Sequence, residues 1–364
     1  MTLLDHHKLQ PFWDLAGGQV KIKALEIALS KSLFDLLLSR SNAEGVAHHE
    51  SFDSPLNVKN TEVWLDLLWS MGCLEKFLEE TSGEVLYSTS EMAKNYFVPN
   101  SSLDCSQAVA FRLNTLQTFT SGFEKLLHAP ERVPKKENNA ESALNMAVAW
   151  ADAAKAQIFQ EQRAVTVPML NKIMDYLMAS GDGVFLAEQR FKQMHFLDLG
   201  GGPGLSALAL AKRFPEATGV VFDFPETAKV ANDNILAAGL QNRVSIQSGD
   251  LNTAQPEGAF DLIWCSSVLH FLDSADEAIA RISTLLKPNG ILLILHAEQT
   301  PEKDHCERVL PFYLFMVMKG NYLPKQGEIS KILNQNSISV IASKQVACSP
   351  MAPVWLHVGR KNHA

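Results

Sequence analysis

Cysteine is scarce in this chain, and its cysteines do not form motifs. No two of them have the C-x-x-C spacing that redox and zinc motifs require. The five cysteines are Cys73, Cys105, Cys265, Cys306 and Cys348. Their scatter argues against a disulfide framework and against a cysteine-based zinc site. It predicts a protein of the reducing cytoplasm, and we expect no bound metal.

Long hydrophobic runs and an excess of positive charge are also lacking. The longest apolar run, Leu310–Met318, is far shorter than the roughly 20 residues that span a bilayer. Met1–Gln10 contains two histidines and no apolar core, so no signal peptide is expected there. The net charge is −8, which argues against nucleic acid or an anionic membrane as the main partner.

Glycine, in contrast, is concentrated in one short segment, Gly200–Gly204. The largely apolar run Phe196–Leu199 precedes it and the amphipathic segment Leu205–Phe214 follows, which predicts a buried strand, a tight turn and a helix. Glycine lets the backbone approach a ligand, and a helix N-terminus favours a negative group. A dinucleotide fingerprint would need glycine where Leu205 stands. The loop therefore predicts a nucleotide-type site, with a nicotinamide or flavin site or a turn without ligand as alternatives.

From this loop onward, strand and helix patterns alternate. The predicted strands after the loop are Gly219–Asp223, Val244–Gln247, Phe260–Cys265, Ile291–Leu295, Ile338–Ile341 and Val354–Val358. Helical patterns cover Thr227–Ala238 and Asp276–Leu286. Such βαβ alternation predicts a doubly wound parallel sheet that binds its ligands at the carboxyl ends of the strands.

Two acidic residues stand at the ends of predicted strands. Asp223 lies about twenty residues past the glycines, where a carboxylate accepts hydrogen bonds from ribose hydroxyls. Asp250 follows the next strand and could accept from an adenine amino group while Leu251 packs on the ring. The alternative for both carboxylates is a solvated strand end.

The chain before about residue 110 reads as a separate, mostly helical region. Gly17–Leu38 has apolar residues at helical spacing, and a second helix is predicted from Thr61 to Gly72. Phe77–Leu78 and Val85–Tyr87 then predict a β-hairpin, an order typical of a winged helix. The second helix carries no Lys or Arg, whereas contacts to a phosphate backbone need cations. The region therefore favours protein–protein contact over DNA binding.

Together these motifs resemble the two-domain class I O-methyltransferases that use S-adenosylmethionine (SAM). That family includes plant phenolic O-methyltransferases, hydroxyindole O-methyltransferase and bacterial enzymes that tailor natural products. The resemblance rests on FLDLGGGPG, FDFPET and GDL, and on ALEIALSKSLFDLL, WLDLLWSMGCLE and YSTSEMAKNYF before them. It implies an α/β, Rossmann-like doubly wound sheet over 190–364 and a helical substrate cap over 111–180, which together form a catalytic domain, 111–364. It also implies a winged-helix dimerisation domain over 1–110, and hence a homodimer.

The resemblance also implies a set of residues that contact SAM. These are Gly200, Gly202, Asp223, Phe224, Asp250, Leu251, Ser266 and Arg163. A guanidinium at Arg163 would suit the methionine carboxylate. The alternative for Arg163 is an ordinary surface arginine.

His270 stands where plant members carry a catalytic histidine. Histidine suits a general base because its unperturbed pKa lies near neutrality. The Asp and Trp that follow in the plant pattern are replaced by Phe271 and Leu272. The alternative is a structural histidine beneath the substrate, with catalysis by proximity alone. The next candidate base is His296, with Glu298 as the carboxylate that would hold its imidazole.

Aromatic and thioether residues recur in the predicted cap and in a Met-rich helix. By resemblance they would line the acceptor pocket, and the alternative is plain core. The candidates are Met146, Trp150, Phe159, Phe315 and Met318. The implied function is transfer of the SAM methyl group to a hydroxyl of a small aromatic or heteroaromatic acceptor, in bacterial secondary-metabolite or pigment biosynthesis. The alternatives are N- or C-methylation on the same scaffold, or a regulatory or scaffold protein that binds SAM without turnover.

Overall fold

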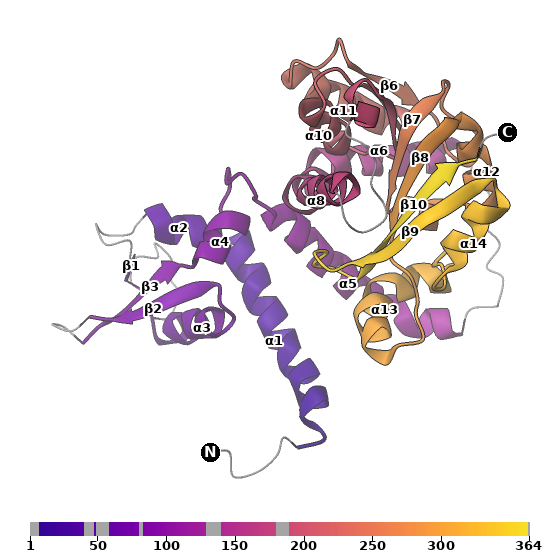
Figure 1. The fold of residues 1–364 in the computed structure, drawn as a ribbon. Helices are drawn as coiled ribbons and strands as arrows, with labels where there is room; N and C mark the ends of the chain where they lie inside the picture. The colour runs from indigo at the N-terminus through magenta and orange to yellow at the C-terminus, as the bar shows by residue number, and fades with distance from the viewer. Residues whose placement is uncertain are drawn as a thin grey trace. The chain divides into compact units, whose positions relative to one another are not determined.

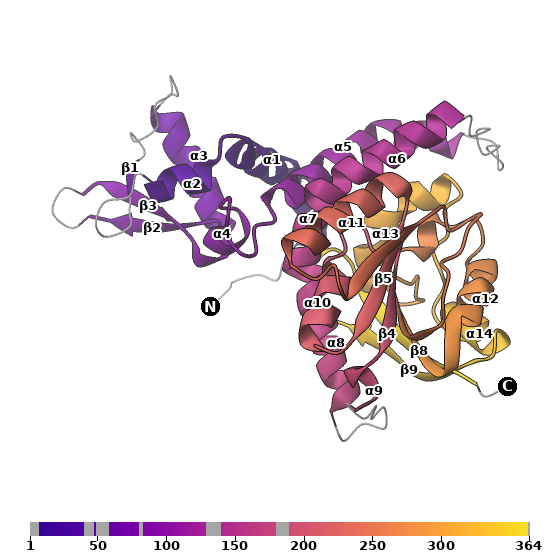
Figure 2. The same ribbon diagram turned by 90° about the horizontal axis from the view of Figure 1, so that it is seen from above.

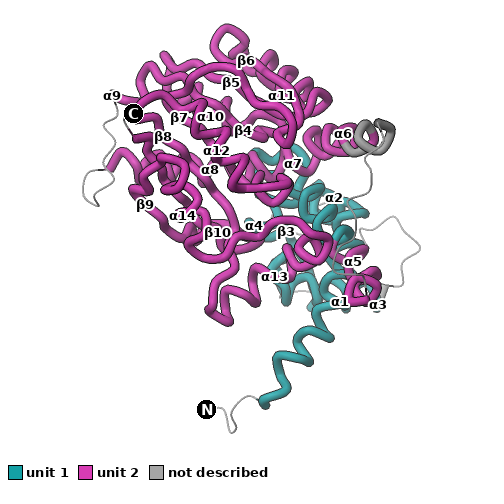
Figure 3. Tube along the Cα trace, turned by 90° about the vertical axis from the view of Figure 1, so that its right-hand side faces the viewer, with its two compact units in different colours: residues 1–115 teal, residues 116–364 magenta. Residues whose placement is uncertain are grey.

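The structure is a computed structural model that describes residues 7–39, 47–48, 58–79, 83–128, 140–179 and 189–362. The chain divides into two compact units, Met1–Thr115 and Leu116–Ala364 (Figure 3). Helix α5 (Ser106–Leu127) runs through the boundary. Each unit has its own apolar core.

The first unit contains helices and a small antiparallel sheet of strand order β1-β3-β2. Its elements are α1 (Gln10–Ser30), α2 (Leu33–Ser39), β1 (Ala47–His48), α3 (Val58–Ser70), β2 (Leu74–Leu78), β3 (Val85–Thr89) and α4 (Glu91–Tyr96) (Figure 1). The expected order of helices followed by a hairpin is present. The winged-helix assignment and the dimerisation role of residues 1–110 stay predictions.

Two boundaries in this unit differ from the sequence pattern. The helical periodicity of Gly17–Leu38 is divided between α1 and α2, because Ser32 has a left-handed backbone with φ +50°. Helix α3 begins at Val58 rather than at Thr61. The core is formed where α1, α2 and α3 bury their apolar faces against β3. Its members include Ala24, Ala28, Leu33, Phe34, Leu37, Leu65, Leu68 and Tyr87.

The second unit is built around a seven-stranded sheet of order β6-β5-β4-β7-β8-β10-β9. Its strands are β4 (His195–Leu199), β5 (Thr218–Asp223), β6 (Val244–Ser248), β7 (Phe260–Ser266), β8 (Leu286–His296), β9 (Ile338–Val346) and β10 (Val354–Lys361). Its helices are α6 (Ala140–Lys155), α7 (Gln157–Glu161), the π-helical turn η2 (Gln162–Thr166), α8 (Val167–Met178), α9 (Gln189–Lys192), α10 (Leu205–Arg213), α11 (Pro225–Ala237), the 3₁₀ turn η3 (Leu269–Phe271), α12 (Ala275–Leu285), α13 (Lys303–Met318) and α14 (Glu328–Gln335).

The predicted Rossmann-like, doubly wound sheet is confirmed, with one correction. Strands β4 to β8 pair in parallel, but β10 pairs antiparallel with both β8 and β9. The connection between β9 and β10 is a short loop, which can join antiparallel neighbours but cannot make a parallel crossover. The all-parallel expectation was therefore wrong at this edge of the sheet.

Helices cover both faces of the sheet, as Figure 2 shows, with α8, α10 and α11 on one side and α12 and α14 on the other. Because successive strand residues point to opposite faces, Phe196 packs in the first layer while Leu197 and Leu199 pack in the second. Burial on both faces explains why these strands are apolar without strict alternation. The carboxyl ends of β4, β5, β7 and β8 therefore meet at one edge of a rigid layer.

Candidate active site

The glycine loop between β4 and α10 is shaped by backbone conformations that favour glycine. Gly200, Gly202 and Gly204 have φ values of +65°, +57° and +78°. The amides of Gly200 and Gly201 donate to the Phe222 carbonyl, at 2.8 and 3.3 Å. A Cβ on Gly200 would lie 2.6 Å from Val268. The loop is thus held against β5 and against the segment after β7.

Asp223, at the end of β5, organises this loop. Its carboxylate accepts from the Gly202 amide at 2.8 Å and from the Phe224 amide at 2.7 Å. Burial raises the pKa of Asp223, and the two amide hydrogen bonds act in the opposite direction. Each carboxylate oxygen keeps further lone pairs for hydroxyl donors. The structure therefore brings together Gly202, Asp223 and Phe224, three of the predicted cofactor residues.

Asp198 lies buried below the same loop. Its carboxylate accepts from the Ala207 amide in the first turn of α10, at 3.1 Å. Burial raises the pKa of Asp198 to about 7; the Ala207 hydrogen bond lowers it, and the negative charge of Asp223 raises it further. Asp198 thus fastens the start of α10 to β4.

Gln162 was missed by sequence reasoning, although it contacts the loop directly. Its Nε2 donates to the Gly201 carbonyl at 3.0 Å, and its Oε1 accepts from the Leu205 amide at 3.1 Å. Arg163 follows it in the same π-helical turn, and its guanidinium lies 5.5 Å from the centre of the Phe159 ring. The assigned role of Arg163 stays a prediction, but the turn that carries it does reach the glycine loop. Nothing in the sequence around Gln162 signals a contact with a loop some forty residues away.

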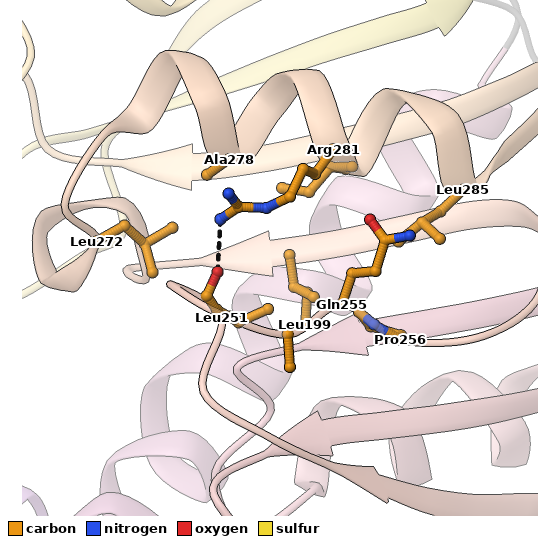
Figure 4. Close-up of a pocket in the computed structure, with 10 residues that line it drawn as sticks. Leu199, Leu251, Gln255, Pro256, Leu272, Ala278, Arg281 and Leu285 are labelled. Carbon is orange, nitrogen blue, oxygen red and sulfur yellow. Dashed lines mark hydrogen bonds between the residues drawn. The ribbon is translucent and has the colours of Figure 1, made fainter. Parts of the chain in front are cut away.

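The segment after β6 carries Asp250 and Leu251. The Asp250 carboxylate accepts from the Asn252 amide at 2.9 Å, so it caps its own turn. The Leu251 carbonyl accepts from Arg281 at 2.6 Å, at a small pocket between this segment and α12 (Figure 4). That pocket is lined by Leu199, Leu251, Ala254, Gln255, Pro256, Leu272, Ala278, Arg281, Ile282 and Leu285. It contains none of the glycines and not Asp223, so the adenine contacts of Asp250 and Leu251 stay predictions.

Ser266 is the last residue of β7 and is half-buried. The next residue, Ser267, has a left-handed backbone, with φ +56°, and its amide donates to the Leu295 carbonyl at 2.9 Å. This kink leads the chain from β7 through Val268 into η3. The predicted contact of Ser266 with the cofactor stays untested.

His270, on η3, belongs to a buried cluster of rings. Its Nδ1 lies 3.1 Å from Nε2 of His296, the last residue of β8. Tyr313 of α13 meets the His270 ring edge-on, with the ring centres 5.6 Å apart. The Asn321 side chain donates to the His270 carbonyl at 2.9 Å. The two histidines named as candidate bases are therefore direct neighbours.

His296 is fully buried, and its other nitrogen, Nδ1, lies 2.6 Å from the Ala297 carbonyl. Burial lowers the pKa of His296 to about 4; the Ala297 contact raises it, and a positive charge on His357 would lower it further. The expected partnership of His296 with Glu298 was wrong. Glu298 instead lies 2.8 Å from Nε2 of His357, a buried histidine of β10, because β10 is inserted next to β8 in the sheet.

The candidate acceptor residues are distributed unevenly around this cluster. Trp150 packs edge-on against Phe271, the residue that follows His270, with ring centres 4.9 Å apart. Phe315 stacks on Phe119 at 4.3 Å, and Phe159 lies under Arg163. Met318 is half-buried at the end of α13. The side chain of Met146 lies outside the described residues. Of the four whose side chains the structure describes, Trp150 contacts the residue next to His270.

The described residues contain neither a membrane-spanning helix nor a cluster of metal ligands. In the described part of the chain, no helix combines the length and the apolar character required to cross a membrane. Nor do three or more His, Cys, Asp or Glu side chains of those residues come together as a metal site.

Comparison with known proteins identifies the core of this unit. Residues 197–294 match the family described as "Methyltransferase domain". This stretch contains the glycine loop, Asp223, Asp250 and His270. This part of the chain is therefore similar to methyltransferase domains.

Several known proteins are similar to longer parts of the chain. Mitomycin biosynthesis 6-O-methyltransferase of Streptomyces lavendulae is 27% identical to it over 43% of the chain and 44% of its own length. The N,N-dimethyltransferase OxyT of Streptomyces rimosus is 27% identical over 79% of the chain and 78% of its own. Human N-acetylserotonin methyltransferase, solved in complex with SAM, shares the fold with a TM-score of 0.73 at 18% identity, over 100% of both chains. The chain spans less than half the length of the curated relatives that it matches first.

Proposed function

We propose that this methyltransferase transfers the methyl group of SAM to a hydroxyl of a small aromatic or heteroaromatic acceptor. One observation carries the proposal: the glycine loop and the histidine cluster lie on adjoining segments. Val268, two residues before His270, sits 2.6 Å from where a Cβ on Gly200 would be. A nucleotide-type loop and a buried imidazole pair therefore meet at the carboxyl edge of the sheet.

The residues present fit the cofactor. The glycines give the loop a tight backbone turn that other residues rarely adopt, and the Asp223 carboxylate offers acceptors for two ribose hydroxyls. Gly200, Gly202, Asp223 and Phe224 would hold the nucleoside, with Asp250, Leu251, Ser266 and Arg163 as further proposed contacts. When bound, SAM supplies a methyl group that is already activated by the positive charge on its sulfur.

The chain's own residues then have two tasks. The loop and the aromatic residues around Trp150 align the acceptor, which lowers the entropic part of the barrier. His270 takes the proton of the acceptor hydroxyl, so that the oxygen keeps its electron pair for the new bond to carbon. Tyr313, edge-on to His270, helps hold the ring in place.

Cofactor binding is tested by calorimetry with S-adenosylhomocysteine. We expect affinity in the micromolar range, and Asp223→Ala should weaken it by ~1–3 kcal/mol because ribose donors lose their acceptor. Asp233→Ala removes an exposed carboxylate on α11, the helix that follows β5; it is the control and should bind normally. No binding by the wild type, or binding of NAD instead, would refute the cofactor assignment.

The chemistry is tested by single-turnover methyl transfer across pH. His270→Ala should reduce turnover roughly a hundredfold or more while the affinity for S-adenosylhomocysteine stays near wild type. The loss should shrink at high pH, because a phenol-like acceptor then ionises in solution. A reduction of less than about threefold would mean that proximity alone carries the reaction.

N-methylation is the second candidate, and the printed name of OxyT, an N,N-dimethyltransferase that matches over most of the chain, favours it. A panel of matched phenols and anilines separates the two. Methylation of the amines alone would replace the O-methyltransferase proposal. Binding of SAM without turnover on either set would favour a regulatory or scaffold protein. The names of several relatives, such as the mitomycin enzyme and a naphthoate 3-O-methyltransferase, support a role in natural-product biosynthesis.

We also propose that the protein forms a homodimer through its first unit. Apolar residues of α2 and α3 such as Phe34 and Leu65 are buried within the unit itself. The first half of α1 exposes several large apolar side chains, and others are exposed on α3, β2 and α4. Those of α1 are Phe12, Trp13, Leu15, Val20 and Ile22; the others are Val63, Trp69, Phe77, Leu78 and Met92. Light scattering at micromolar concentration should give a dimer, and Leu15→Asp with Val20→Asp should give a monomer; a monomeric wild type would contradict the proposal.

A further inference from the structure

The hydrogen bonds of the two buried histidines, His270 and His296, indicate which ring nitrogen carries the hydrogen. His270 and His296 come from η3 and from the end of β8, and both side chains are buried. Nδ1 of His270 faces Nε2 of His296 at 3.1 Å, and Nδ1 of His296 faces the Ala297 carbonyl at 2.6 Å. These two contacts form a chain of hydrogen bonds that ends on a main-chain oxygen.

The direction of that chain follows from the carbonyl. A carbonyl oxygen only accepts, so Nδ1 of His296 must carry a hydrogen. In a neutral imidazole the other nitrogen then has the lone pair, so Nε2 of His296 accepts and Nδ1 of His270 donates. The lone pair of a neutral His270 therefore resides on Nε2.

This hydrogen-bond direction holds when His296 is neutral, and its surroundings favour that form. The ring is 0% exposed, and burial lowers its pKa to about 4. The titratable groups packed around it are His270 of η3, Tyr313 of α13 and His357 of β10, and no carboxylate hydrogen-bonds to it among the described residues. Glu298, the nearest carboxylate along the chain, is engaged with His357.

We propose that His296 is a positioning residue that holds His270 in the tautomer whose Nε2 is the base. The proposal rests on the proposed function. In the step that it supports, the acceptor O–H bond breaks, the proton moves to Nε2 of His270, and the oxygen keeps the electron pair. The ring becomes an imidazolium whose Nδ1–H still donates to a neutral partner. Because that partner carries no negative charge, it stabilises the imidazolium less than a carboxylate would, and His270 is a weaker base. The pair therefore suits an acidic, phenol-like hydroxyl rather than an aliphatic alcohol.

Nitrogen-15 NMR of the full chain with labelled histidine reads the tautomers directly, without cofactor or substrate. At pH 7.5 we expect both rings to be protonated on Nδ1 and unprotonated on Nε2, with assignments from His270→Asn and His296→Gln. A His270 ring protonated on Nε2 would overturn the inference.

Two substitutions at the same position separate positioning from packing. His296→Leu keeps an apolar side chain but removes the acceptor, and we expect turnover to fall roughly tenfold to a hundredfold. The amide of His296→Gln offers an oxygen to His270 and an N–H to the Ala297 carbonyl, and turnover should stay within about threefold of wild type. His195→Gln, at the opposite end of the sheet, is the control and should not change turnover.

The outcomes distinguish this inference from the proposed function. Equal losses in His296→Leu and His296→Gln, or no loss in either, would overturn the positioning role. Calorimetry with S-adenosylhomocysteine on every variant shows whether the cofactor site is intact. If a variant binds normally, its loss of turnover is due to the altered base, His270. Failure of the wild type to bind S-adenosylhomocysteine would refute the proposed function, while the NMR arm would still decide the tautomer.

Discussion

The two ends of the candidate site are built in different ways. At the nucleotide end, the glycine loop, Asp223 and Phe224 are connected by hydrogen bonds to backbone amides. At the acceptor end, His270, His296 and Tyr313 come from three separate elements and meet through their side chains.

The difference predicts different consequences of mutation. A loop held by its own backbone loses its shape when a side chain is added, so changes there should alter binding. A cluster held by side chains keeps its backbone when one is exchanged, so changes there should alter turnover and pH dependence. The following experiments test that division, from the largest expected effect to the smallest.

Gly200→Ala should have the largest effect. Gly200 has φ +65°, and its new Cβ would lie 2.6 Å from Val268, so the loop and the segment leading to η3 must both shift. We expect the affinity for S-adenosylhomocysteine to fall at least a hundredfold in calorimetry. Gly239→Ala is a matched control, because Gly239 has φ +68° but nothing within 4 Å of a new Cβ. Similar losses in both variants would show that backbone strain, and not the contact with Val268, causes the effect.

The free energy of unfolding should change with pH in opposite directions because of Asp198 at the nucleotide end and His296 at the acceptor end. The folded-state pKa of Asp198 is raised from 3.8 to about 7, so the folded protein binds more protons than the unfolded chain in that range. The free energy of unfolding therefore falls as pH rises from 3.8 to 7, by about 4 kcal/mol from this group. Asp198→Asn should remove that loss, so the stability of the variant relative to the wild type should increase as pH rises. Urea unfolding at a series of pH values measures the difference.

His296 gives the opposite sign. Its folded-state pKa is lowered from 6.5 to about 4, so the folded protein binds fewer protons than the unfolded chain between these values. Stability is then lost as pH falls from 6.5 to 4, by about 3 kcal/mol. Below pH 6.5, the stability of His296→Gln relative to the wild type should therefore increase as pH falls. If the free energies of unfolding of wild type and variant change in parallel with pH, His296 is not held neutral.

Gln162→Leu should give the smallest effect. It removes the hydrogen bonds to the Gly201 carbonyl and from the Leu205 amide, which together should cost about 1 kcal/mol, or roughly fivefold in affinity for S-adenosylhomocysteine. Gln193→Leu should bind normally, because this exposed side chain precedes β4 while the loop follows the other end of that strand. A loss of turnover without a loss of affinity would place Gln162 at the acceptor end instead.

The sequence by itself determined the parts of this protein that depend on local pattern. Apolar runs of strand length and the glycines after Leu199 predicted β4 to β8 and the loop, because period and backbone freedom are properties of neighbouring residues. The same pattern predicted Asp223 at the end of β5, beside the loop.

Tertiary structure alone decided which side chains meet. The insertion of β10 beside β8 brings His357 to Glu298 and takes that carboxylate away from His296. The π-helical turn before α8 brings Gln162 to the loop, and η3 brings His270 to His296. Such pairings depend on sheet order and helix packing, which are set by the burial of the whole core. No spacing within the sequence carries that information.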